Sequence, residues 1–151
     1  MKLVSPAFSS GGRIPSRYSR YSHGSRPPLS ILGVPPSSWL SLLIYDPDAP
    51  NPLAPTCVWS HEILTDIAPG ESLDSGGIQG KNSWQHRKYE GPQPPFGRHR
   101  YVFDVIATNS PFALGPNATR EDIEAALKRG EPHELARAKL VGTFAKEDLE
   151  E

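Results

Sequence analysis

Proline and glycine limit what this chain can fold into more than any other feature of its sequence. The 151 residues include 17 prolines and 13 glycines. Proline interrupts helix interiors and central strands, and glycine weakens both, so we expect short elements separated by rigid loops. Aromatic and β-branched residues nevertheless cluster between the prolines in patterns typical of strands, which argues against a disordered chain.

Four segments have the residue pattern of β-strands. An almost unbroken apolar run over 39–46 is typical of a strand that is buried on both faces. A second strand is predicted over 57–64, a third over 99–107 and a fourth over 134–145.

A period of two then assigns the side chains of the second and third strands to faces. In the second strand, Ser60 and Glu62 are predicted to lie opposite a face that holds Cys57, Trp59, His61 and Ile63. We expect Glu62 to be exposed. In the third strand, one face is predicted to hold His99, Tyr101, Phe103 and Val105.

One segment has the pattern of a helix. Thr119 can cap its N-terminus, Asp122 stands at the capping-box spacing, and Gly130 can end it. Its narrow apolar stripe consists of Ile123, Ala126 and Leu127.

The rest of the chain is predicted to be loop, over 5–36, 46–56 and 66–98. No internal repeat or change of composition divides the sequence, so we expect residues 1–151 to form a single, mostly β domain with one or two short helices.

Charge and apolar content argue against several classes of function. Sixteen Lys and Arg against 17 Asp and Glu give a net charge of −1, which creates no field to attract nucleic acid or an anionic membrane. No segment approaches the roughly 20 apolar residues that a membrane span needs, so no membrane insertion is expected. A single cysteine, Cys57, and no apparent signal peptide predict a cytoplasmic protein.

Two rigid loops deliver polar side chains to strand ends. The first, Asp46-Pro47-Asp48-Ala49-Pro50, follows the buried strand, and we expect a cis peptide bond between Ala49 and Pro50. The second, over 91–97, is rich in glycine and proline and leads into His99 and Tyr101. His99 shares a face of its strand with Tyr101, and His61 shares a face of its strand with Trp59.

These residues have other interpretations that the sequence leaves open. A histidine on an apolar face is often only a core residue, and an acidic turn is often only a solvated loop. Asp46, Asp48, His61 and His99 could instead bind Zn²⁺ or Mn²⁺ and make the chain a metal-dependent hydrolase. The pocket could also recognise a phosphorylated protein partner through loop arginines, although we expect these four to be solvated: Arg13, Arg17, Arg20 and Arg26.

Three strings of residues occur in an order that resembles one known family. They are Asp46-Pro47-Asp48-Ala49-Pro50, Trp59-Ser60-His61 and Gly91-Pro92-Gln93-Pro94-Pro95-Phe96-Gly97-Arg98-His99-Arg100-Tyr101. Together they resemble the phosphatidylethanolamine-binding protein family, also called Raf kinase inhibitor-like proteins, in its shorter bacterial and archaeal branch. Weaker similarities extend over most of the chain, at Ser5-Pro6-Ala7-Phe8, Ile14-Pro15, Pro27-Pro28-Leu29 and Val141-Gly142-Thr143.

The resemblance implies a fold, a function and a set of site residues. It implies a central, largely antiparallel β-sheet packed on a smaller sheet, and a pocket for phosphate-like anions or phospholipid head groups. It implies no enzymatic activity and no cofactor, a possible role in regulating or inhibiting kinases or proteases, and a possible homodimer. The pocket residues that it implies are Asp46, Asp48, Pro50, Trp59, His61, Gly91, Pro92, His99 and Tyr101.

The chain departs from the family pattern in two places. The stretch over 19–26 replaces a Cys-Asp-Gly-type segment, so functions attached to that segment are not transferred. The C-terminal extension of longer members is not matched, so kinase inhibition is not transferred either.

An anion site with two carboxylates requires an explanation. A neighbouring carboxylate favours the charged imidazole, so we expect His61 or His99 to stay protonated near neutral pH and to donate hydrogen bonds to the anion. Tyr101 and the backbone N–H of Gly91 would add neutral donors. Anion binding is therefore predicted to strengthen as the pH falls.

Overall fold

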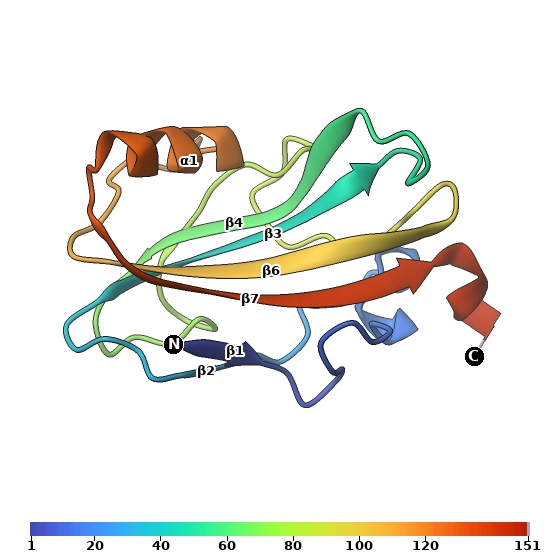
Figure 1. Ribbon diagram of the computed structural model, residues 1–151, viewed down its shortest axis with the longest axis horizontal. Coiled ribbons are helices and arrows are strands. Elements are labelled where there is room, and N and C mark those ends of the chain that lie inside the picture. The colour runs from blue at the N-terminus through green and yellow to red at the C-terminus, as the bar shows by residue number, and fades with distance from the viewer. Residues whose placement is uncertain (151) are drawn as a thin grey trace.

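A five-stranded antiparallel sheet forms the centre of the computed structural model, which describes residues 1–150 (Figure 1). Its strand order is β5-β4-β3-β6-β7. The strands are β3 (Trp39–Ala49), β4 (Cys57–Ile67), β5 (Ile78–Gln79), β6 (Arg98–Thr108) and β7 (Glu134–Ala145). The four long strands agree with the predicted segments to within three residues at each end.

Other elements cover the two faces of this sheet. A small antiparallel sheet of β1 (Lys2–Val4) and β2 (Ser30–Leu32) lies on one side, and the helix α1 (Arg120–Arg129) lies on the other (Figure 1). Three short 3-10 helices complete the fold: η1 (Ser16–Tyr18), η2 (Arg20–Ser22) and η3 (Lys146–Glu150). The expected fold class, a mostly β domain with a large sheet packed on a smaller one, is therefore confirmed.

Alternation along the strands divides the apolar core between the two faces. Leu42 and Ile44 of β3 pack towards the small sheet, in a cluster with Leu3, Phe8, Ile14, Tyr101, Phe103, Val105 and Phe144. Leu43 lies on the opposite face and packs under α1, in a cluster with Ile63, Ile106, Phe112 and Ile123. The predicted burial of this strand on both faces is confirmed.

The helix begins and ends where the sequence indicates. The side chain of Thr119 accepts a hydrogen bond from the Asp122 N–H at 3.3 Å, and the Asp122 carboxylate accepts one from the Thr119 N–H at 3.0 Å. Gly130 ends the helix in the left-handed conformation, with a φ of 73°.

The N-terminal segment crosses the outer strand β7 and covers its edge. The N–H of Gly11 donates to the carbonyl of Val141, and Ile14 and Gly12 exchange hydrogen bonds with Thr143 at 2.8 Å each. The loop prediction for 5–36 thus missed β2 and the two 3-10 helices, which contain too few residues to show a period. The loop prediction for 66–98 missed β5 for the same reason.

Glu62 is buried, so the prediction that it is exposed was wrong. Only 1% of its surface is accessible, and its carboxylate accepts hydrogen bonds from Arg26 Nε and Gln79 Nε2, both at 2.7 Å. The face of β4 that carries Glu62 is covered by a loop that brings in Arg26 from 36 residues away. Arg26 is correspondingly not a solvated side chain.

Candidate functional site

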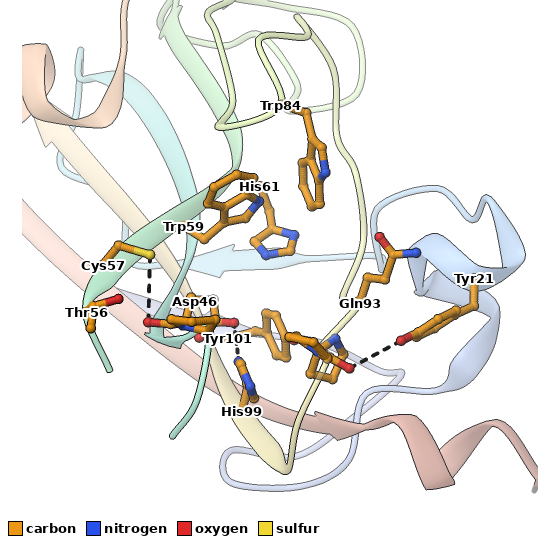
Figure 2. A pocket seen from close by; sticks show the side chains of 14 residues that line it. Tyr21, Asp46, Thr56, Cys57, Trp59, His61, Trp84, Gln93, His99 and Tyr101 are labelled. Carbon is orange, nitrogen blue, oxygen red and sulfur yellow. Dashed lines mark hydrogen bonds and ion pairs between the residues drawn. The ribbon is translucent and has the colours of Figure 1, made fainter. Parts of the chain in front are cut away.

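The ends of three neighbouring strands build a cavity at one end of the large sheet. In an antiparallel sheet, the C-terminal end of β3 lies beside the N-terminal ends of β4 and β6. The cavity has a volume of about 590 Å³ (Figure 2). Its lining residues are Tyr21, Asp46, Ala49, Pro50, Thr56, Cys57, Trp59, His61, Trp84, Gln93, Pro94, Pro95, His99 and Tyr101.

The predicted site residues divide into two groups. Six of the nine line the cavity: Asp46, Pro50, Trp59, His61, His99 and Tyr101. The structure places Asp48, Gly91 and Pro92 outside its lining. The Ala49–Pro50 peptide bond is cis, as predicted.

One wall of the cavity is aromatic. The ring of His61 meets those of Trp84 and Tyr101 edge to face, with centroids 5.1 Å and 5.2 Å apart and interplanar angles of 81° and 86°. Trp59 meets Trp84 in the same manner at 5.4 Å (Figure 2). These contacts hold the imidazole of His61 in one orientation.

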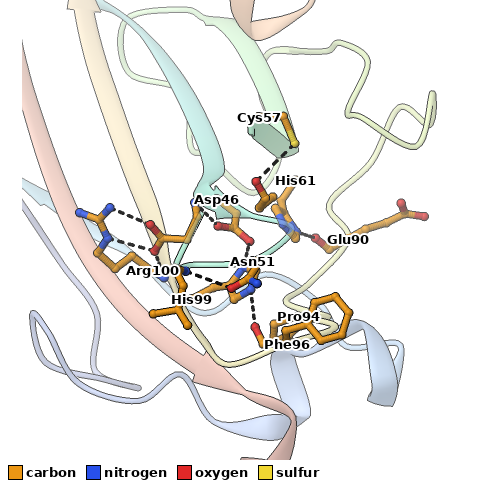
Figure 3. Close-up of polar contacts among 12 residues, drawn as sticks. Asp46, Asn51, Cys57, His61, Glu90, Pro94, Phe96, His99 and Arg100 are labelled. Atoms are coloured by element: carbon orange, nitrogen blue, oxygen red, sulfur yellow. Dashed lines mark hydrogen bonds and ion pairs between the residues drawn. The ribbon is translucent and has the colours of Figure 1, made fainter. Parts of the chain in front are cut away.

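His99 is fully engaged with the protein. Its Nδ1 lies 2.5 Å from Oδ2 of Asp46, and its Nε2 lies 2.8 Å from the carbonyl oxygen of Phe96 (Figure 3). A carbonyl oxygen only accepts, so Nε2 carries a proton, and a further proton must lie between Nδ1 and the carboxyl group. His99 therefore has no N–H left for a ligand, and the expectation that it donates to an anion was wrong.

Asp46 is held by its neighbours as well as by His99. Its Oδ1 accepts a hydrogen bond from the N–H of Asp48 at 2.7 Å, and the residue is 4% exposed. Burial raises the pKa of Asp46, while the hydrogen bonds from His99 and Asp48 act in the opposite direction. The Asp46–His99 pair, with its shared proton, contributes no net charge to the cavity.

His61 is neutral at physiological pH. Burial lowers its pKa to about 4. The hydrogen bond from Nδ1 to the Glu90 carbonyl, 2.7 Å long, and the backbone of Gly91 offset this lowering only in part (Figure 3). The sequence-based expectation allowed either His61 or His99 to be the protonated ring. His61 is not, because the groups nearest to it are aromatic rings and a carbonyl rather than a carboxylate.

Tyr101 carries a polar group with no partner. Its side chain lines the cavity and the residue is 1% exposed, yet its hydroxyl makes no hydrogen bond within residues 1–150. Burial and the nearby Asp46 raise the pKa of this phenol, so it stays protonated and can donate. A buried hydroxyl without a partner is costly, so this donor is available to a water molecule or a ligand in the cavity.

Asp48 turns away from Asp46 because the strand is irregular between Asp46 and Ala49. Its carboxylate accepts three hydrogen bonds from Arg100: from the backbone N–H at 2.8 Å, Nε at 3.0 Å and Nη2 at 2.7 Å (Figure 3). The hydrogen bonds from Arg100 lower the pKa of Asp48. Asp48 thus anchors the acidic turn to β6.

Gly91 and Pro92 join the cavity wall to a distant segment. The carbonyl of Pro92 accepts from the N–H of Arg20 at 3.0 Å, and a Cβ on Gly91 would lie 2.0 Å from the carbonyl oxygen of Tyr18. Glycine is therefore needed at this position, because these two segments of the chain pack closely against each other.

The same segment supplies cavity residues that sequence reasoning missed. Tyr21 lines the cavity and donates its hydroxyl to the Pro94 carbonyl at 3.2 Å (Figure 2). Arg20 donates to Gln93 Oε1 at 2.6 Å and lies over the ring of Trp84, so it is not a free, solvated side chain. Tyr21 and Trp84 lie in segments predicted to be loops, where no sequence pattern pointed to the cavity. Cys57, in contrast, was predicted to share a strand face with Trp59 and His61.

The alternative of a metal centre finds no support in this geometry. Within residues 1–150 there is no group of three His, Cys, Asp or Glu side chains arranged to hold a metal ion. Asp48 is bound to Arg100, and both ring nitrogens of His99 contact oxygen atoms of the protein.

No helix within residues 1–150 is long and apolar enough to cross a membrane.

Comparisons with known proteins agree on one relationship. The sequence profile described as phosphatidylethanolamine-binding protein matches residues 4–145. A UPF0098 protein of Methanothermobacter thermautotrophicus is 38% identical over 95% of this chain and 98% of its own length.

Two solved structures share the fold. A putative phosphatidylethanolamine-binding protein homologue, CT736 of Chlamydia trachomatis, superimposes with a TM-score of 0.81 at 33% identity, covering 96% of this chain and 97% of its own. YbcL of E. coli, described as a new member of the mammalian family, gives 0.77 at 20% identity, covering 95% and 96%.

Proposed function

Because the chain belongs to the phosphatidylethanolamine-binding protein family, we propose that it is a binding protein whose cavity takes up a small phosphate-type anion without reacting with it. The observation that carries this proposal is the buried Tyr101 hydroxyl, a donor beside the cavity with no partner in residues 1–150. An oxyanion would satisfy it.

The electrostatics of the lining suit a singly charged ligand held mainly by neutral groups. No lysine or arginine is among the lining residues, and the Asp46–His99 pair is neutral overall. A hydrogen bond from a neutral donor to an anionic oxygen contributes about 1.5–3 kcal/mol, and few such donors line the cavity, so we expect a modest affinity.

Absence of catalysis is part of the proposal. Thr56 and Cys57 are the lining residues with a hydroxyl or thiol nucleophile on an aliphatic carbon, and the thiol donates to the carbonyl of Ala49 at 3.7 Å rather than to a base. Acyl or phosphoryl transfer needs a nucleophile within hydrogen-bond reach of a base. We therefore expect a phosphate ester to be recovered intact after incubation with the protein.

Calorimetric titration with inorganic phosphate tests the binding proposal. The Tyr101→Phe variant should bind phosphate about ten- to a hundredfold more weakly than the natural protein, since one hydrogen bond to the anion is lost. Tyr45→Phe is the matched control, because its hydroxyl bonds to Asp104 at 3.0 Å and does not line the cavity. Absence of binding to the natural protein between pH 5 and pH 8 would overturn the proposal.

A further inference from the structure

We infer that the cavity selects a phosphate monoester in its singly protonated, monoanionic form, because it presents a hydrogen-bond acceptor at His61 as well as donors. This inference rests on the proposed anion-binding function and goes further, because it distinguishes monoesters from phosphodiesters, including lipid head groups. It follows from the hydrogen bonds in which the protons of the cavity residues already take part.

The acceptor is Nε2 of His61. A carbonyl oxygen has no proton to give, so the 2.7 Å contact with Glu90 fixes the ring proton on Nδ1. In the neutral ring, Nε2 then carries a lone pair. His61 lines the cavity, and the 2.7 Å contact of Nδ1 together with the edge-to-face contacts of Trp84 and Tyr101 favours this one orientation of the ring, in which Nε2 is the nitrogen available to a ligand.

No neighbouring group changes the role of His61 Nε2 as a hydrogen-bond acceptor. The titratable groups that face His61 or lie near it are Tyr101 and His99 of β6, Asp46 of β3 and Glu90 of the covering loop. His99 has both ring protons committed, to Asp46 and to the Phe96 carbonyl. The Glu90 carboxylate is itself bonded to His86 at 2.7 Å and lies outside the lining of this cavity.

The chemistry of the ligand follows from this arrangement. A fully deprotonated oxygen opposite Nε2 would bring two lone pairs together, whereas a P–OH group would donate to the nitrogen. The remaining oxygens of the same ligand can accept from the Tyr101 hydroxyl. A phosphate monoester below its second pKa, about 6, has both kinds of oxygen. A phosphodiester and a sulfate ester carry the same charge but have no such proton.

Three small anions of equal charge separate these possibilities: methyl phosphate, dimethyl phosphate and methyl sulfate, titrated calorimetrically at pH 5.5. We expect methyl phosphate to bind at least about tenfold more tightly than the other two, since they leave the His61 nitrogen facing an acceptor. Above about pH 6.5 its affinity should fall roughly tenfold per pH unit, as the monoanion is depleted. The ³¹P chemical shift of the bound ester should keep its monoanion value at pH 7.5.

The variant His61→Gln can turn an amide N–H₂ towards the ligand. We expect the preference for methyl phosphate over methyl sulfate to shrink to within about twofold and the pH dependence to flatten. Equal affinity of the natural protein for methyl phosphate and methyl sulfate, or a dianion shift in the ³¹P spectrum, would overturn the inference while leaving anion binding intact. No binding of any of the three anions would overturn the proposed function as well. The titrations and spectra of the natural protein decide the matter even if the variant fails to fold.

Discussion

The buried imidazole of His61 makes the stability of the protein depend on pH. Its pKa is about 4 in the folded protein and about 6.5 in an unfolded chain, so between these values the unfolded state binds more protons. The free energy of unfolding should therefore fall as the pH drops from 6.5 to 4, by up to about 1.4 kcal/mol per pH unit from this residue.

Urea unfolding at pH 4.5, 5.5 and 6.5 measures this dependence. The His61→Gln variant should have a shallower slope over the same range, because glutamine at position 61 does not titrate. Equal slopes in the two proteins would show that folding does not lower the pKa of His61.

Glu62 and Arg26 form an ion pair that the fold covers almost completely. Their side chains are 1% and 14% exposed. Replacing Glu62 with Ala leaves the Arg26 guanidinium with the exposed carboxylate of Asp74, 3.6 Å away, and the Leu73 carbonyl, so we expect a loss of about 2–4 kcal/mol in the free energy of unfolding.

Chemical denaturation of Glu62→Ala and of the double variant Glu62→Leu, Arg26→Met tests this prediction. The double variant should recover much of the loss, since two apolar side chains remove both buried charges. A loss of less than 1 kcal/mol in the single variant would mean that solvent reaches the pair.

At the scale of elements, the closure of the cavity depends on the contact between two segments that have no regular strand pairing. The segment of η1 and η2 contacts residues 89–94 through three hydrogen bonds. The Tyr89 hydroxyl donates to the Tyr18 carbonyl. The Arg20 N–H donates to the Pro92 carbonyl, and the Arg20 side chain donates to Gln93 Oε1. Tyr21 of the same segment lines the cavity and donates its hydroxyl to the Pro94 carbonyl at 3.2 Å.

Gly91→Ala should separate these two segments. Its Cβ would lie 2.0 Å from the Tyr18 carbonyl oxygen, so one of the two segments must move. We expect weaker phosphate binding together with a loss of about 1–3 kcal/mol in stability. Gly70→Ala is the control, because Gly70 has a φ of 86° but nothing within 4 Å of the added carbon. It should cost stability through backbone strain and leave the affinity for phosphate unchanged. Calorimetry and thermal melts of both variants separate the two effects.

Elements with a clear period were predictable from the sequence, and the site was predictable where it lies on them. The four long strands and the capped helix follow from apolar alternation and from Thr119 and Gly130. Five of the residues that line the cavity, Asp46, Trp59, His61, His99 and Tyr101, were singled out because they stand at strand ends, and Pro50 was implied by the family resemblance.

The rest depends on geometry that a sequence period does not express. The orientation of Asp48 results from a local irregularity in β3 and from Arg100, 52 residues away. The protonation of His61 depends on which carbonyl its ring meets, and Trp84 reaches the cavity from a loop. Burial of Glu62 likewise required Arg26 to be brought over β4.

At the scale of the whole molecule, Asp148 fastens the C-terminal region to the sheet. Its carboxylate accepts hydrogen bonds from Arg98 at 2.9 Å and 2.7 Å and from the Ala145 N–H at 3.1 Å, and Arg13 of the N-terminal segment lies 3.7 Å away. The hydrogen bonds from Arg98 lower the pKa of Asp148. The stabilisation is therefore present above the unfolded pKa of about 3.9 and is lost as the pH falls through the lower folded value.

Asp148→Asn should lower the free energy of unfolding at pH 7 by about 1–3 kcal/mol, because charge-assisted hydrogen bonds are replaced by neutral ones. The difference from the natural protein should be smaller at pH 2, below the unfolded pKa of about 3.9, because the carboxyl group loses its charge as the pH falls through its lowered folded pKa. Paired denaturation curves at the two pH values provide the measurement. A difference that persists undiminished in acid would assign the effect to packing rather than to charge.

The position of Cys57 gives the molecule a built-in chemical reporter. It is the single cysteine of the chain, it is exposed, and it lines the cavity beside Trp59. A thiol reagent such as a maleimide dye can therefore modify the protein at one defined atom, without any engineered mutation. An occupant of the cavity should slow that modification, so the rate of labelling reports occupancy in mixtures too crude for calorimetry.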